Sequence, residues 1–218
     1  MGTVGIVDPG VGSIRSAELA FRRICREIAS PPRVQVVTAP HEARACDALV
    51  LAPRGAFAPI AQALRRTELA RVLAEHLAQQ RPVFAIDLGM QLLFERCGPA
   101  PGLGLLLGEV RQLEPTIQLM TGLPARVPHV GWNRLLIERR DSRVIDALGR
   151  QGTWVSFDHA THVIPEDRGL IAATTEHGAG SIVAAISRGS LVGTQFRPER
   201  SQRAGIRMIV GFLGSLAG

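Results

Sequence analysis

The sequence contains no lysine and no tyrosine, and aromatic residues make up only 4% of it. All 25 basic residues are therefore arginines, which outnumber the 19 acidic residues and give a formal net charge of +6. Nucleic-acid-binding proteins cluster their basic residues and place aromatic side chains among them, whereas these arginines are scattered along the chain. We therefore expect no nucleic-acid partner, and the charge suits an acidic or phosphorylated partner surface instead.

Cysteine is also scarce, and long apolar runs are absent. Cys25, Cys46 and Cys97 are an odd number without the spacing of a metal site, so we expect all three to be reduced. The first two are predicted to be buried, and Cys97 to be a loop thiol. No apolar run is long enough to span a bilayer, and the N-terminus enters an expected strand without a secretory signal. These features predict a cytoplasmic protein without a membrane partner.

Short, uniformly apolar segments alternate with amphipathic ones in the first 95 residues. They predict strands at 4–8, 34–38, 47–52 and 83–86, and helices over 14–28, from a cap at Thr67, and over 90–95. This order is typical of a mostly parallel sheet with helices on both faces. Strands at 170–175, 182–187 and 191–195 and a helix at 201–217 complete the pattern. We therefore expect one α/β domain over residues 1–218, built on an open mixed sheet.

The segment FAIDLGMQLLFE, residues 84–95, predicts a strand that enters a helix through a tight turn at Asp87. This geometry presents a nucleophile at the apex of the turn, and serine or cysteine usually occupies the apex. Ligands of such folds bind in the loops at the carboxyl ends of the parallel strands. The loops after Asp8, Ala52 and Ile86 have that position, and we expect residues 195–199 to join them.

Six segments, in order along almost the whole chain, resemble the glutaminase subunit of imidazole glycerol phosphate synthase, a triad-type glutamine amidotransferase. They are IVDPGVGSIRSAELAFRR, ALVLAPRGAF, IDLGMQLLFE, GLGLLLGEVRQL, VPHVGWN and GTQFRPERS. The resemblance implies the class I glutamine amidotransferase fold and a heterodimer with a (β/α)₈-barrel cyclase. In that family the glutaminase passes ammonia from glutamine to the barrel, which serves histidine and purine synthesis.

The residues that this chemistry needs are replaced. The family uses a cysteine thiolate, a histidine that moves its proton, and a carboxylate that orients the histidine. The resemblance places Asp87 at the cysteine position and Arg197 at the histidine position, while Glu199 matches the carboxylate. An arginine cannot act as a base because its pKa lies above about 12. We therefore expect a catalytically degenerate member of the family.

The loop that would stabilise the oxyanion has changed as well. Backbone N–H groups normally point at the developing negative charge. The family pattern Pro-Gly-Val-Gly is replaced by Ala52, Pro53, Arg54 and Gly55. Pro53 removes an N–H group and restricts φ where the family has glycine.

The three triad positions carry charges of alternating sign. We expect the Arg197 guanidinium to lie within hydrogen-bonding reach of Asp87, Glu199 or both, and Asp87 to stay ionised beside it. One interpretation is an inert site, closed by ion pairs between these side chains. The other is an ion-paired site that mimics the charges of the working site and holds the turn at Asp87, the elbow, in one conformation.

The remaining candidates have both a functional and a structural interpretation. Gln91 matches a substrate-binding glutamine of the family, or is a solvated helix residue. The resemblance implies that VPHVGWN faces the barrel, with Trp132 and Asn133 as contacts and His129 in a structural role. An exposed tryptophan is a typical interface anchor.

Metal and cofactor sites are not predicted. Asp158, His159 and His162 form a polar cluster that lacks a further ligand at suitable spacing. Gly10 and Gly12 resemble a phosphate-binding turn, but the full dinucleotide fingerprint is missing.

Two functions remain open. The first is a non-catalytic subunit that docks on a cyclase-like barrel and supports or regulates it. The second is a repurposed enzyme in which Asp87 acts as base or nucleophile on a substrate other than glutamine, while Arg197 binds a carboxylate or phosphate.

Overall fold

The computed structural model describes residues 2–117, 122, 124–149 and 152–216. The helices are α1 (Arg15–Cys25), α2 (Pro40–Arg44), α3 (Phe57–Arg66), α4 (Leu69–Ala78), α5 (Leu88–Leu92), α6 (Arg143–Asp146) and α7 (Gln202–Gly214), with the short 3-10 turns η1 (Arg168–Leu170) and η2 (Pro198–Arg200). The strands are β1 (Thr3–Val7), β2 (Arg33–Val37), β3 (Ala48–Leu51), β4 (Val83–Ile86), β5 (Phe94–Cys97), β6 (Ala100–Pro101), β7 (Leu106–Gln112), β8 (His129–Arg134), β9 (Leu136–Ile137), β10 (Trp154–His159), β11 (Thr161–Pro165), β12 (Ile171–His177), β13 (Gly180–Arg188) and β14 (Leu191–Thr194).

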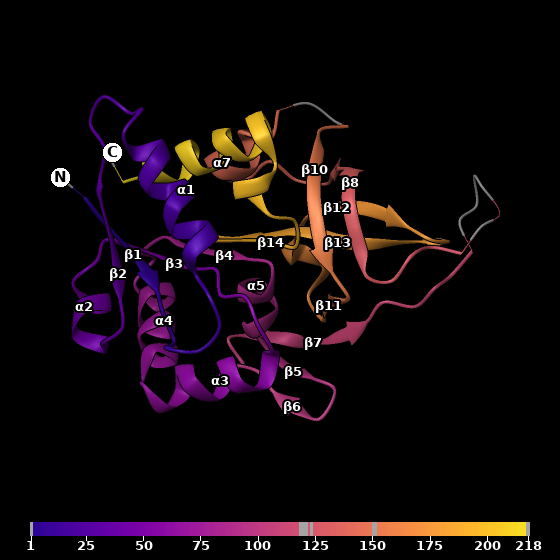
Figure 1. Cartoon of the computed structure of the whole chain (residues 1–218), viewed down its shortest axis with the longest axis horizontal. Coiled ribbons are helices and arrows are strands. Elements are labelled where there is room, and N and C mark those ends of the chain that lie inside the picture. Colours follow the sequence, from indigo (N-terminus) through magenta and orange to yellow (C-terminus); the bar gives the residue numbers. More distant parts are fainter. Residues whose placement is uncertain (1, 118–121, 123, 150–151, 217–218) are drawn as a thin grey trace.

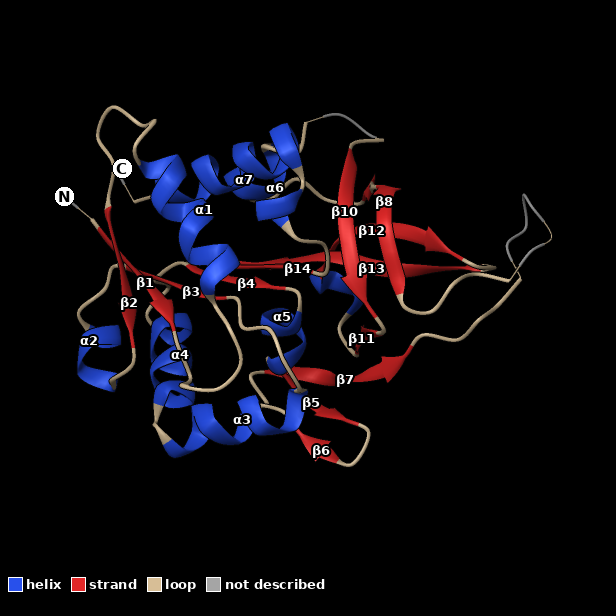
Figure 2. Ribbon diagram, in the orientation of Figure 1, coloured by secondary structure: helices blue, strands red, loops and turns tan. Residues whose placement is uncertain are grey.

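Eight strands form one mixed sheet in the order β2-β1-β3-β4-β14-β13-β12-β9 (Figure 2). The first five strands in this order run parallel, and the last three continue the sheet antiparallel. All residues of β3 and β4 are buried, which explains why they read as continuous apolar runs without alternation. The predicted open, mostly parallel α/β sheet is confirmed.

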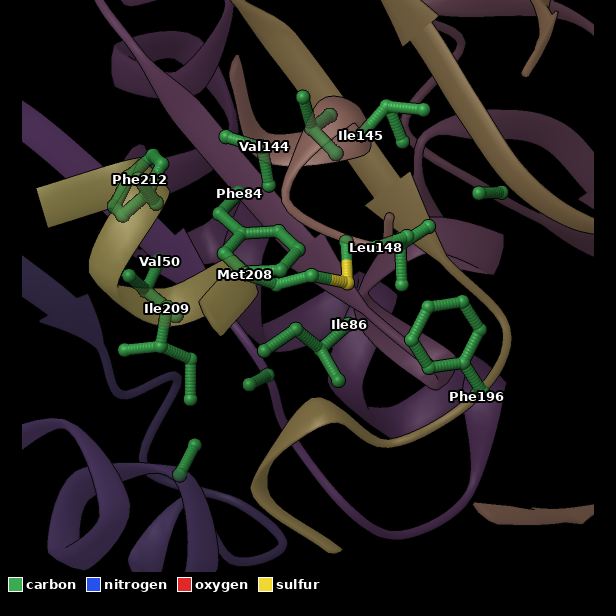
Figure 3. Packing of buried hydrophobic residues seen from close by; sticks show 14 of the residues in the cluster. Val50, Phe84, Ile86, Val144, Ile145, Leu148, Phe196, Met208, Ile209 and Phe212 are labelled. Atoms are coloured by element: carbon green, nitrogen blue, oxygen red, sulfur yellow. The ribbon is translucent and has the colours of Figure 1, made fainter. Parts of the chain in front are cut away.

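Helices cover both faces of this sheet (Figure 1). On one face α1 and α7 pack on β4, and Figure 3 shows Phe84 and Ile86 facing Met208 and Phe212. Phe84 and Phe212 lie with ring centroids 5.3 Å apart, a separation at which aromatic pairs stabilise the core beyond their area burial. On the other face α3 and α4 pack on the opposite side chains of β3 and β4, including Leu51.

Two smaller sheets flank the end of the central sheet. Strands β8 and β10 form an antiparallel ribbon, and β11-β7-β5-β6 form a four-stranded sheet. The ribbon packs against the core on the α1 and α7 side through Val155 and Phe157 of β10. The four-stranded sheet joins the α3 and α4 side through side chains such as Val110 and Val163.

The parallel strands β1, β3, β4 and β14 are neighbours, so their carboxyl ends meet at one edge of the sheet. Asp87 follows β4, the loop 52–55 follows β3, and residues 195–199 follow β14. The candidate site therefore lies at this edge, beside the β8–β10 ribbon.

Three predictions about local structure were wrong. Thr67 ends α3 instead of starting the next helix, because its Oγ1 donates to the Ala63 carbonyl at 2.8 Å, and Glu68 precedes α4. The helix after Asp87 ends at Leu92, since Phe94–Cys97 forms β5 by pairing with β7. Cys97 therefore lies in a strand. The pairing partners lie 12 or 13 positions further along the chain, outside the segment itself, so its local periodicity did not reveal the strand.

The helix ends also differ from those predicted. Helix α1 ends at Cys25, and residue 217, the expected end of α7, lies outside the described residues. Cys25 and Cys46 are buried, as predicted, and all three cysteines are free. None of the helices in the described part of the chain combines the length and apolarity needed to cross a membrane.

Candidate functional site

Asp87 stands at the apex of the strand–turn–helix that the sequence predicts. Its φ of 53° and ψ of −115° lie in a region that a residue with a side chain rarely adopts. The backbone holds it there: its N–H donates to the Thr194 carbonyl at 2.6 Å, and its carbonyl accepts from the N–H groups of Met90 and Gln91. Two residues later, a Cβ on Gly89 would lie 1.9 Å from the Leu51 carbonyl oxygen, so glycine lets α5 approach β3.

The Asp87 carboxyl is not held in the ionised state at neutral pH. Its Oδ1 accepts a hydrogen bond from Nε2 of the buried Gln195 at 3.0 Å. Burial raises the pKa of Asp87 from 3.8 to about 7, and the opposing positive charge of Arg197 does not offset it. The prediction that Arg197 keeps this carboxyl fully ionised was therefore wrong, and Asp87 titrates near neutral pH.

Arg197 binds Glu199 and Asp158. Its side chain is 2% exposed, and its Nε and Nη2 donate to Oε1 of Glu199 at 2.9 and 2.7 Å. Nη1 lies 3.4 Å from Oδ2 of Asp158, and Nη2 lies 3.2 Å from the Ser16 hydroxyl. Among the described residues no hydrogen bond or ion pair joins Arg197 to Asp87. The expected contact of Arg197 with Asp87, Glu199 or both is thus made with Glu199.

Asp158 lies among arginines and not in the predicted histidine cluster. Its Oδ2 accepts hydrogen bonds from Arg54 at 3.1 Å and from Arg197 at 3.4 Å, and Arg200 lies 3.9 Å away, within ion-pair distance. The side chains of Arg54 and Arg200 are 50% and 56% exposed. Residues alternate between the two faces of a strand, and β10 buries His159 while Asp158 is only partly buried. This alternation was the sequence signal that separates Asp158 from His159.

The loop after β3 is pinned to the turn after β1. Ser13 and Arg54 exchange two backbone hydrogen bonds, of 2.9 and 2.8 Å. A Cβ on Gly12 would lie 2.2 Å from the Arg54 carbonyl oxygen, so this glycine serves a close backbone approach. Pro53 has no N–H, and the Arg54 N–H donates to Ser13. Residues 53 and 54 therefore offer no free N–H to a negative charge at the turn. Gly55 follows with a φ of 146°, a conformation that favours glycine.

Gln91 is buried and fully bonded, which excludes the interpretation of a solvated helix residue. Its Nε2 donates to the Thr161 carbonyl at 3.0 Å and to Oε1 of Gln195 at 3.2 Å. Its Oε1 accepts from the Thr161 hydroxyl at 2.9 Å. Because an amide nitrogen has two hydrogens, no donor of Gln91 remains for a substrate in this arrangement. Gln91 positions Gln195, which in turn bonds to Asp87.

His129 and His159 form a neutral, buried pair. His159 Nδ1 lies 2.8 Å from the Thr161 carbonyl, which can only accept, so Nδ1 carries the hydrogen. His159 Nε2 then accepts from His129 Nδ1 at 3.2 Å, and His129 Nε2 accepts from Asn133 at 3.2 Å. Burial lowers the pKa of His129 to about 4 and that of His159 to about 3.

The histidines pack against other side chains and do not form a metal site. His129 stacks on Phe157 at a centroid distance of 4.5 Å. Burial also lowers the pKa of His162, whose Nδ1 has no hydrogen-bond partner within the described part of the chain. In the parts of the chain that the structure describes, no three His, Cys, Asp or Glu side chains are grouped to hold a metal.

The free face of the β8–β10 ribbon carries exposed apolar side chains. Val130, Trp132 and Trp154 are 64%, 46% and 57% exposed, and Trp132 lies opposite Ser156 in the register. Asn133 turns away from this face, since its Nδ2 donates to the Glu176 carbonyl at 2.8 Å. The sequence interpretation missed Trp154, although strand alternation places it on the same face as Trp132.

Comparisons with known proteins agree with this geometry. The family model "Glutamine amidotransferase class-I" matches residues 7–213. The chain is 36% identical over 216 residues to the imidazole glycerol phosphate synthase subunit HisH of Synechococcus sp. (strain JA-3-3Ab), covering 98% of this chain and 94% of that one. It is 33% identical over 210 residues to the HisH subunit of Aquifex aeolicus, covering 95% and 94%.

A solved structure supports the fold independently. The structure of PurLQS from Thermotoga maritima superposes with a TM-score of 0.73 at 18% identity, over 99% of this chain and 100% of that one. At 18% identity this structural match shows the fold alone. The matches to the HisH subunits exceed 30% identity over nearly the whole chain, and they show the family. The protein therefore belongs to the class-I glutamine amidotransferases, and among them to the HisH family.

Proposed function

We propose that this chain is a catalytically degenerate glutaminase-type subunit that binds a cyclase-like (β/α)₈-barrel partner as a heterodimer and supports or regulates it. Its relatives are named as HisH subunits of imidazole glycerol phosphate synthase, which supports a synthase-type partner. The proposal assigns Asp87, Arg197 and Glu199 to the former triad positions, with Pro53, Arg54 and Gly55 in the former oxyanion loop.

One observation carries the loss of glutaminase activity. Arg197 is 2% exposed and bound to both Glu199 and Asp158, so the position that should move a proton holds a permanently charged, ion-paired group. A carboxylate such as Asp87 is in addition a poor nucleophile toward an amide, since attack would give a mixed anhydride. Hydrolysis of glutamine through a thioester and a histidine is not available to this site.

The exposed face of the ribbon supports the binding role. A tryptophan that is half exposed in the isolated chain is a typical anchor of a protein interface. Trp132 and Trp154 both have this exposure and lie on one face beside the candidate site. His129 and Asn133 support the strand from behind, through their mutual hydrogen bond.

The test is to purify the chain with the barrel cyclase encoded in the same genome and to assay the complex. We expect a one-to-one complex in which ammonium salts, but not glutamine, support formation of imidazole glycerol phosphate. A HisH relative with cysteine and histidine at the positions of Asp87 and Arg197 is the control for glutamine use. Glutamate release that depends on this chain contradicts the proposed degeneracy, and the absence of a complex contradicts the proposed partner.

The titration of Asp87 favours a second candidate, the repurposed enzyme. A carboxyl group whose pKa is about 7 is suited to general-base catalysis at neutral pH. The substrates to assay are esters and amides that carry a carboxylate or phosphate. Turnover that rises with pH through about 7 and is lost in Asp87→Asn supports this candidate. No turnover across the panel favours the non-catalytic subunit.

A further inference from the structure

A pocket opens between α1, η2 and α7, on the face of the sheet that these two helices cover. Its cavity volume is about 410 Å³, within the range of roughly 300–1,000 Å³ that is typical of small-molecule sites. The helices lie side by side here (Figure 1), and Phe21 of α1 meets Phe212 of α7 edge to face with ring centroids 6.3 Å apart. The residues that line the pocket come from 16–27 and 198–209.

Apolar side chains from both helices line this pocket. Ile24 and Ile209 are buried between the helices, whereas Leu19 of α1 and Ile206 of α7 are exposed. Exposed apolar surface in a concavity is typical of a ligand site, because a bound molecule removes that surface from water. The pocket therefore suits a ligand with an apolar part.

Glu199 gives the pocket an unused hydrogen-bond acceptor. The side chain of Glu199 is 4% exposed and lines the pocket. Its Oε1 accepts from Arg197 at 2.9 and 2.7 Å and from the Ser16 hydroxyl at 3.4 Å. Oε2 is buried and has no hydrogen-bond partner within the described residues. Because a buried acceptor without a donor is unfavourable, a ligand that brings an N–H group to Oε2 is favoured.

Two arginines offer unused donors at the same pocket. Arg23 of α1 and Arg200 of η2 line it, and more than half of each side chain is exposed. Arg23 lies 3.7 Å from Glu27, and Arg200 lies 3.9 Å from Asp158, so both pairs are beyond hydrogen-bonding distance. The two guanidinium groups can therefore bind the carboxylate of a ligand through charge-assisted hydrogen bonds.

We propose that this pocket binds a small α-amino acid with an apolar side chain. The ammonium group donates to Oε2 of Glu199, the carboxylate binds Arg23 or Arg200, and the side chain covers the exposed apolar wall. A zwitterion suits the pocket because Glu199 and the two arginines carry opposite charges. Glu199 then holds Arg197 through one oxygen and the ligand through the other. The inference goes beyond the proposed heterodimer, since residues of this chain alone form the pocket.

The test titrates the isolated full chain with L-leucine and with three analogues. Isocaproate lacks the ammonium group, isoamylamine lacks the carboxylate, and L-glutamine lacks the apolar side chain. We expect leucine to bind saturably in calorimetry and to raise the melting temperature. Each analogue should bind at least about tenfold more weakly, because it lacks one of the three contacts.

A pair of substitutions at exposed positions tests the apolar wall. Leu19→Gln with Ile206→Gln should weaken leucine binding about tenfold, since two apolar contacts are lost. The matched control is Leu107→Gln with Val210→Gln, which replaces exposed apolar side chains that do not line the pocket. Val210 is 40% exposed and Ile206 is 43% exposed, one helical turn apart on α7. We expect the control to bind leucine within about twofold of the wild type.

Glu199→Gln tests the acceptor. This substitution removes the negative charge that meets the ammonium group, so the ratio of leucine affinity to isocaproate affinity should fall about tenfold. It also weakens the bond to Arg197, and thermal unfolding is measured in parallel. Should this variant fail to fold, the double variant of Leu19 and Ile206 and the analogues still decide the outcome.

The outcomes are distinguishable. If leucine does not bind the wild-type chain, this inference is overturned and the proposed heterodimer is unaffected. Equal weakening in the two double variants, or in neither, places the ligand elsewhere and overturns the inference. Isocaproate or isoamylamine binding as tightly as leucine contradicts recognition of an amino acid. Displacement of leucine by L-glutamine at equal concentration would show that leucine occupies the former substrate position, and the proposal would be wrong.

Discussion

Arg197 donates two hydrogen bonds to one oxygen of Glu199, at 2.9 Å from Nε and 2.7 Å from Nη2. The second Glu199 oxygen, Oε2, is buried and has no hydrogen-bond partner among the residues that the structure describes. The buried positive charge is therefore held chiefly by Glu199, and the elbow carboxyl of Asp87 is left to Gln195. This arrangement separates the three triad positions into an ion pair and a neutralisable acid.

The Arg197–Glu199 pair predicts a specific pattern of stability. Arg197→Met leaves Glu199 buried without its partner, and we expect a loss of about 3–5 kcal/mol in the free energy of unfolding. Adding Glu199→Gln should recover part of that loss. Adding Asp87→Asn instead should recover less, since the hydrogen bonds and ion pairs of the described residues do not join Asp87 to Arg197. Chemical denaturation of the single and double variants measures both couplings. Equal recovery by the two second substitutions would show that Asp87 is the main partner.

The raised pKa of Asp87 predicts how stability depends on pH. The folded chain holds this proton up to a pH of about 7, whereas the unfolded chain releases it near 3.8. Between these values the folded state binds more protons, so this carboxyl lowers the free energy of unfolding as the pH rises. Asp87→Asn should therefore be more stable than the wild type at pH 8, by roughly 1–3 kcal/mol for a largely buried carboxyl. Below pH 4 this advantage should disappear. Denaturation at both pH values provides the measurement, and a difference independent of pH contradicts the assignment.

The histidine pair predicts the opposite trend on acidification. His129 and His159 have folded-state pKa values of about 4 and about 3, below the ordinary value of 6.5. The unfolded chain takes up these protons first, so their contribution to stability is lost as the pH falls from 6.5 toward 4. His159→Gln should weaken this acid sensitivity, although it also removes the bonds to His129 and Thr161. The slope of unfolding free energy against pH is the readout. An unchanged slope would mean that other groups cause the acid sensitivity.

One substitution should not give this chain glutaminase activity. Asp87→Cys places a thiol at the apex of the turn, but Arg197 still cannot accept the proton of this thiol. Asp87→Cys with Arg197→His supplies both groups, yet Pro53 and the Arg54 N–H remain unable to face an oxyanion. We expect the double variant to stay at least about a hundredfold below an intact relative, the typical effect of losing an oxyanion donor. Glutamate release is the assay, in the presence of the barrel partner. Activity of Asp87→Cys alone would refute the proposed role of Arg197.

The two exposed tryptophans should dominate partner affinity. Trp132→Ala and Trp154→Ala are each expected to weaken the heterodimer by about 2–4 kcal/mol, the usual effect of an anchor residue. Leu107→Ala is the control, because Leu107 is 60% exposed but lies on β7, in the four-stranded sheet. Titration calorimetry with the barrel cyclase measures all three. If Leu107→Ala weakens binding and the tryptophan variants do not, the interface lies on the four-stranded sheet.

Several features of the protein are determined by the sequence alone. The apolar runs of β1, β3 and β4 predict a parallel sheet, because only strands buried on both faces are apolar at every position. The turn at Asp87 follows from the same local pattern, since a buried strand leads directly into an apolar helix. The identities of Asp87 and Arg197 at the site are also sequence facts, and they carry the proposal that the glutaminase chemistry is lost.

Tertiary structure decided which of these groups interact and in what protonation state. Gln195 and Asp87 lie 108 positions apart and Arg54 and Asp158 104 positions apart, so neither contact follows from periodicity. The strand β5 depends in the same way on its pairing with β7, which overrode the helical pattern after Asp87. The pKa of Asp87 depends on how deeply the folded chain buries it, because desolvation there outweighs the attraction of Arg197. Local sequence patterns specify which face of an element is apolar, whereas pairing and desolvation arise only when distant segments pack together.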